Sequence, residues 1–66
     1  MKTREVLSFI NDDEWLQILI LIENNQPLQA VSILRFYTGF DLMQGSKVIK
    51  NIAKEELNLD ILNFIH

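Results

Sequence analysis

Apolar side chains recur every three or four residues along nearly the whole of this 66-residue chain. This spacing is typical of one face of an α-helix, and the short dipeptides that close β-hairpins are absent. Pro27 and Gly39 interrupt the pattern where helices would begin or end. The sequence therefore predicts an all-α fold in one domain, residues 1–66. We expect a small bundle of four to five helices around a helix-turn-helix hairpin.

The starts of the first two predicted helices are marked by residues suited to capping. Thr3 is predicted to cap a short helix near the N-terminus. Asn11 and Glu14 have the spacing of a capping box, and the acids beside them suit the positive end of a helix dipole. The second helix then runs from Trp15 to Glu23.

Turn residues mark the helices that follow. Pro27 suits the first turn of a third helix, and Gly39 suits a left-handed stop after it. Asp41 is predicted to cap a fourth helix, with Gln44 at capping-box spacing. Residues 58–66 have ambiguous spacing and are predicted to form a short fifth helix or a strand. The side chains of the hairpin expected to be buried are Val31, Leu34, Leu42, Val48, Ile49 and Ile52.

Composition excludes most kinds of catalytic or metal site. The chain has no cysteine, so it has no disulfide and no thiolate ligand, and its one histidine is the last residue. The acids of residues 12–14 lie at a predicted helix start, where capping explains them better than metal binding. No serine has a histidine nearby in sequence, and no glycine-rich phosphate loop is present. We therefore expect no enzyme activity, no metal and no cofactor.

The second predicted helix is apolar on every side. Its apolar run, Ile18–Ile22, is far shorter than the roughly 20 residues that a membrane span needs. No apolar run of signal-peptide length follows the N-terminus, so we expect a cytoplasmic protein without membrane contact. A helix that is apolar all round must be covered on more than one face. The sequence therefore predicts a homo-oligomer formed through helix 15–22, or a partner that docks there.

Charge is divided between acidic ends and a basic middle. The net charge of −3 argues against a general binder of nucleic-acid phosphates. Residues 35–54 nevertheless contain four basic residues and one acidic residue, a local net charge of +3. Residues 1–34 and 55–66 each carry a net charge of −3. The predicted hairpin therefore offers a positive surface that suits an acidic protein partner.

The segment from Arg35 to Gly45 reads Arg-x-x-Thr-Gly-Phe-x-Leu-x-x-Gly after an apolar helix. With its surroundings, residues 25–52, it resembles the C-terminal domain of the bacterial ribosomal stalk protein. The resemblance implies a hairpin at about residues 25–54, a tight turn at residues 38–39, and a close approach of the two helices at Gly45. It also implies an exposed surface for translation GTPases. The matching positions and two neighbouring lysines are the predicted partner-binding residues: Val31, Ser32, Arg35, Ser46, Lys47 and Lys50.

Three functions follow from these patterns. The first is a small non-enzymatic protein–protein interaction module, such as a phage or accessory bacterial protein that modulates a host protein. The second, implied by the resemblance, is a factor associated with the ribosome or translation GTPases. The third is a helix-turn-helix DNA-binding protein, in which Gln44, Lys47, Lys50 and Asn51 face bases and phosphates. The overall acidity of the chain argues against this third function.

Overall fold

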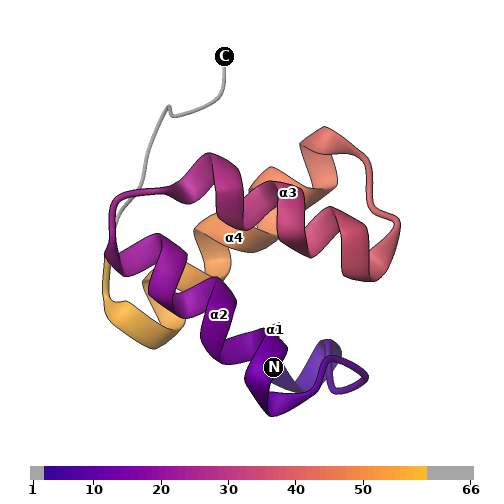
Figure 1. Ribbon diagram of the computed structural model, residues 1–66, viewed down its shortest axis with the longest axis horizontal. Coiled ribbons are helices and arrows are strands. Elements are labelled where there is room, and N and C mark those ends of the chain that lie inside the picture. The colour runs from indigo at the N-terminus through magenta and orange to yellow at the C-terminus, as the bar shows by residue number, and fades with distance from the viewer. Residues whose placement is uncertain (1–2, 60–66) are drawn as a thin grey trace.

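The computed structural model describes residues 3–59, which form four helices and no strand (Figure 1). Helices α3 (Pro27–Thr38) and α4 (Leu42–Leu57) form a hairpin that turns through residues 39–41. Helix α2 (Asp12–Glu23) packs against both of them, and α1 (Thr3–Val6) contacts α4. This arrangement confirms the predicted all-α bundle of four to five helices. The last predicted element, residues 58–66, lies outside the described residues from position 60 onward.

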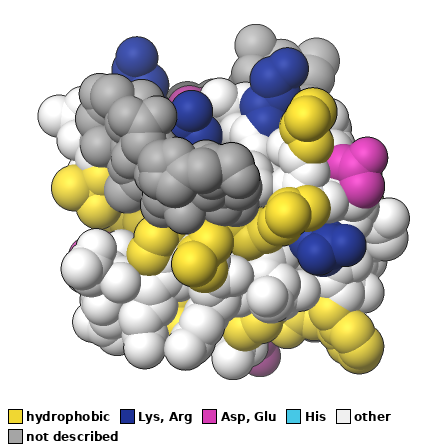
Figure 2. All heavy atoms as spheres, turned by 90° about the horizontal axis from the view of Figure 1, so that it is seen from above, with side chains coloured by type: hydrophobic (Ala, Val, Ile, Leu, Met, Phe, Trp, Pro, Cys, Tyr) yellow, Lys and Arg dark blue, Asp and Glu magenta, His cyan; other side chains and the backbone are white. Residues whose placement is uncertain are grey.

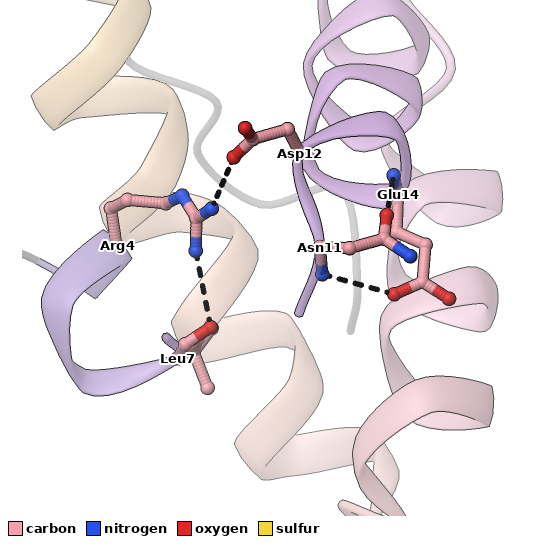
Figure 3. A network of polar contacts seen from close by, with 5 residues as sticks. All are labelled: Arg4, Leu7, Asn11, Asp12 and Glu14. Carbon is pink, nitrogen blue, oxygen red and sulfur yellow. Dashed lines mark hydrogen bonds and ion pairs between the residues drawn. The ribbon is translucent and has the colours of Figure 1, made fainter. Parts of the chain in front are cut away.

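The predicted capping box at the start of α2 is present (Figure 3). The side chain of Asn11 accepts a hydrogen bond from the backbone N–H of Glu14 at 2.8 Å. The backbone N–H of Asn11 in turn donates to Oε1 of Glu14 at 3.2 Å. Two backbone N–H groups at the helix start are thus satisfied reciprocally by side-chain oxygens. At the start of α4, Asp41 accepts from the backbone N–H of Gln44 at 2.7 Å, which confirms the predicted cap.

Thr3 does not cap α1 through its own side chain, so this prediction was wrong. Thr3 is itself the first residue of the helix, and its backbone N–H donates to Oε1 of Glu55 at 2.7 Å. Its hydroxyl donates to Oε2 of the same carboxylate at 2.9 Å. A side chain of α4 therefore takes the capping role and ties α1 to the last turns of α4. The helix is also short, since it has only four residues, and a turn follows Val6.

Residues with positive φ follow three of the helices. Asn25 comes after α2 with φ 60°, Gly39 after α3 with φ 80°, and Asn58 after α4 with φ 53°. The backbone N–H of Gly39 donates to the carbonyl oxygen of Arg35 at 2.8 Å. The predicted left-handed stop at Gly39 is therefore confirmed, and two asparagines, the non-glycine residues that best tolerate this conformation, serve the same purpose.

The core lies where α2, α3 and α4 meet, and the turn after α1 closes one end of it. Five of the six side chains predicted to be buried are buried. Leu42 is the exception, with 47% of its surface exposed, because it begins α4 at the end of the bundle, one turn before the first core position of that helix. The buried apolar side chains are Leu7, Ile10, Trp15, Ile18, Ile22, Ala30, Val31, Leu34, Val48, Ile49, Ile52 and Ala53.

Candidate protein-binding surface

Arg35 lies across the turn that joins α3 to α4. Its Nε–H donates to the carbonyl oxygen of Phe40 at 3.1 Å. Its aliphatic stem covers Gly45, since a Cβ atom placed on Gly45 would lie 2.9 Å from Cγ of Arg35 and 3.4 Å from Cγ1 of Val31. The close approach predicted for Gly45 is therefore present, and the arginine stem fills the space that a side chain at position 45 would need.

The predicted binding residues of α3 differ in their exposure to solvent. Val31 is only 2% exposed and contributes to the core, so its predicted surface role does not hold in this fold. Its neighbours Ala30 and Leu34 are buried with it, because these three residues share the inward side of the helix. Ser32 and Arg35 are exposed. The polar members of the predicted set on α3 thus remain accessible to a partner, whereas the apolar member does not.

Phe36 is a surface residue that the predicted set did not include. Its side chain is 86% exposed, and it lies one helical turn after Ser32. Tyr37 beside it is half-buried, and the two rings meet edge to face with centroids 5.9 Å apart. Two adjacent aromatics on a helix point about 100° apart, which predicts that at least one of them faces outward. This adjacency was the signal in the sequence that pointed to an exposed ring.

The outer side of α4 carries what we call the basic face: Met43, Lys47, Lys50 and Lys54. Steps of four, three and four residues keep these side chains on one side of the helix, opposite the buried positions. All four are exposed, and Met43 is 82% exposed. Within residues 3–59 no ion pair engages the three lysines. Their charges are therefore available to a binding partner.

Ser46 lies beside this face and is half-buried. Its hydroxyl donates to the carbonyl oxygen of Leu42 at 2.6 Å, one turn earlier in α4. Figure 2 views the side of the molecule that α3 and α4 form. Dark-blue Lys and Arg side chains lie along its upper edge and toward its right, and yellow hydrophobic side chains lie between them. This side therefore combines positive charge with exposed apolar surface.

The acids at the start of α2 have structural roles (Figure 3). Asp12 accepts from Nη2 of Arg4 at 2.9 Å, and Glu14 completes the capping box with Asn11. The guanidinium of Arg4 also lies 5.0 Å from the ring centre of the buried Trp15, at cation–π distance. In the part of the chain that the structure describes, no three His, Cys, Asp or Glu residues are grouped so that they could hold a metal ion. Glu14 therefore has the predicted capping role, whereas Asp12 pairs with Arg4.

The surface on α3 and α4 consists of exposed apolar and cationic side chains, and no side-chain polar atom within residues 3–59 is buried without a partner. Such a surface can bind a partner by burying apolar side chains and by attracting negative charge. Among those residues, no helix is long and apolar enough to cross a bilayer. Comparison of the chain with protein-family models, curated proteins and solved structures finds no match.

The packing of Arg35 over Gly45 leads to a testable prediction. We expect Gly45→Ala to destabilise the domain by roughly 1 kcal/mol, because the strain of overpacking outweighs the helix propensity gained over glycine. In an Arg35→Ala background the added methyl group has room, so the same substitution should stabilise the domain. Urea denaturation of the wild-type chain, the two single variants and the double variant measures the free energy of unfolding of each. An equal change in the free energy of unfolding on Gly45→Ala in both backgrounds would contradict the packing of Arg35 against Gly45.

Proposed function

We propose that this protein is a small, non-enzymatic protein–protein interaction module that binds an acidic protein through α3 and α4. One observation carries the proposal: the two most exposed large apolar side chains among residues 3–59, Phe36 and Met43, lie beside exposed cations. Phe36 follows Arg35 directly, and Met43 lies one turn before Lys47. Aromatic residues, methionine and arginine are the types enriched at the centres of protein interfaces.

The two kinds of side chain contribute differently to binding. Burial of Phe36 and Met43 against a partner would supply most of the affinity, since a few large side chains dominate interface energetics. Arg35 and the lysines of the basic face would select an acidic partner and accelerate the encounter. The guanidinium of Arg35 can also hold a carboxylate by two hydrogen bonds, which a lysine cannot reproduce. We further propose a cytoplasmic location, which the absence of cysteine fits, and a bacterial or phage source, which the small size and acidity of the chain fit.

Association with translation GTPases is a narrower form of this proposal. The left-handed Gly39 and the close packing at Gly45 are features that the resemblance to the stalk domain implies, and they support a shared hairpin geometry. The stalk domain usually has lysines where this chain has Ser32, Met43 and Ser46. We therefore propose an acidic protein as the general partner and a translation GTPase as one member of that class.

DNA binding is the competing function, and a specific observation supports it. The turn of three residues between α3 and α4 suits a helix-turn-helix, and Gln44, Lys47, Lys50 and Asn51 are all exposed on the second helix of the hairpin. The net charge of −3 opposes this function, because binding to DNA depends strongly on neutralising phosphates. The same experiment separates the two functions.

That experiment is affinity capture from bacterial lysate with and without nuclease, using the wild-type chain and two matched variants. Phe36→Ala removes an exposed ring from the proposed surface, whereas Phe9→Ala removes a ring that is 64% exposed in the turn after α1. We expect a captured acidic protein whose affinity falls at least tenfold in Phe36→Ala, a change of about 1.4 kcal/mol, and is unchanged in Phe9→Ala. Capture lost on nuclease treatment would support DNA binding. Equal effects of the two variants would overturn the proposed surface.

A further inference from the structure

The outer side of α2 is an apolar strip with an acid at each end. We call this the α2 face: Asp13, Leu16, Gln17, Ile20 and Glu23. Leu16 is 54% exposed and Ile20 is 46% exposed, although α3 and α4 cover the opposite side of the helix. The bundle therefore covers only one side of a helix that is apolar all round. The other side offers two large aliphatic side chains to an additional contact.

The charge of the α2 face restricts what can cover it. The helix contains four acidic residues and no basic residue. Two of the acids are engaged, Asp12 by Arg4 and Glu14 by the cap, but no ion pair involves Asp13 or Glu23 within residues 3–59. A surface that covers Leu16 and Ile20 must therefore accept a free carboxylate at either end.

A symmetric pairing of two α2 helices does not meet this requirement. In an antiparallel pair Asp13 of one copy lies near Glu23 of the other, and in a parallel pair each acid meets its own copy. Like charges brought together in an interface oppose its formation. The simple prediction of a homo-oligomer formed by helix 15–22 packing against itself is therefore electrostatically unfavourable.

The basic face of α4 can accept both carboxylates within the same chain, because Lys54 lies at one end of it and Lys47 lies one helical turn from Met43 at the other end. It has an exposed apolar residue, Met43, followed by three lysines with no ion pair within residues 3–59. The α2 face spans eleven residues and the basic face twelve, so the ten and eleven rises of 1.5 Å between their ends make both faces about 15–17 Å long. The two faces therefore match in length and are opposite in charge.

We propose that the α2 face of one copy docks on the basic face of a second copy. The contact is heterologous, because different surfaces of the two copies meet, and each pair keeps one free face of each kind. Addition of further copies then gives chains or closed rings. The inference rests on the proposed function in one respect: it uses the basic face as a protein-binding surface and names a second copy as its occupant.

Two variants, each altered on one face, test the contact. The first is Leu16→Ser/Ile20→Ser, which weakens the α2 face. The second is Lys47→Glu/Lys50→Glu, which reverses charge on the basic face. Circular dichroism verifies that each variant is folded. If the serine variant loses helix, Asp13→Asn/Glu23→Gln, which preserves side-chain shape, replaces it.

Sedimentation velocity measures the mass of the species formed. We expect the wild-type chain to form species above twice 7.7 kDa that shrink as salt is added, and each variant alone to stay at 7.7 kDa. An equal mixture of the two variants should form a species of twice 7.7 kDa and nothing larger. In that mixture, the intact basic face of the first variant meets the intact α2 face of the second, and both remaining faces are altered.

Other outcomes overturn the inference. A wild-type chain that stays monomeric, or a mixture that does not pair, excludes the heterologous contact. Dimers of the Lys47→Glu/Lys50→Glu variant alone would show that α2 pairs with itself. A monomeric chain that still captures an acidic protein through Phe36 would refute only this inference. Assembly without such capture would refute only the proposed function.

Discussion

Ile49→Ala is expected to lower the free energy of unfolding by about 2–5 kcal/mol. Ile49 is completely buried between α4 and the rest of the core, so its truncation leaves a cavity as well as removing apolar contact. A 66-residue domain has a total stability of only about 3–10 kcal/mol, so this single change removes a large share of it. Urea denaturation followed by circular dichroism measures the loss as a lower midpoint.

Leu42→Ala is the matched control for this prediction. Both residues lie in α4 and both were predicted from the sequence to be buried, but Leu42 is 47% exposed. Because half of its side chain is already in water, we expect a loss of about 1 kcal/mol. Equal losses for Leu42→Ala and Ile49→Ala would show that the end of the bundle is packed as tightly as its centre, contrary to the structure.

Gly39→Val is expected to destabilise the domain by about 1–3 kcal/mol, and Gly39→Asn by clearly less. The φ angle of Gly39 is 80°, a conformation that β-branched residues avoid and asparagine accepts. A Cβ atom at this position would have no other atom within 4 Å. The difference between the variants therefore reports backbone strain alone, because neither side chain meets a steric obstacle at its first atom.

Thermal melts of the wild-type chain and both variants measure this difference. Gly39→Ala is a useful third member, since alanine has a Cβ atom but no β-branch and should fall between the other two. Equal melting temperatures for Gly39→Val and Gly39→Asn would mean that the helix stop does not depend on the left-handed conformation.

The helix boundaries were predictable because local residues specify them. Asn11 with Glu14 and Asp41 with Gln44 are separated by three positions, so both partners of each bond are visible in a short stretch of sequence. The failure at Thr3 has the opposite cause. Its partner, Glu55, is 52 residues away, and no local pattern connects the two.

The candidate surface was predictable in its charges and less so in its apolar residues. Lys47 and Lys50 are exposed as expected, because they lie opposite the periodic apolar positions of α4. Val31 was predicted to be buried from its spacing, which is confirmed, and was also named as a partner-binding residue through the resemblance to the stalk domain; its place beside Leu34 on the inward side of α3 puts it in the core. The contact of Arg35 with the Phe40 carbonyl depends on the path of the turn, which the sequence alone does not specify.

The bond between Thr3 and Glu55 also has a consequence for how the chain folds. The helices α2, α3 and α4 pack against neighbours in sequence, and such local contacts form quickly. The contact of α1 with α4 joins two segments at opposite ends of the described chain, so it closes the longest loop within residues 3–59. Short terminal segments open at a lower free energy than the helices of the core. We therefore expect α1 to dock last during folding and to be the first segment whose backbone amides exchange with solvent.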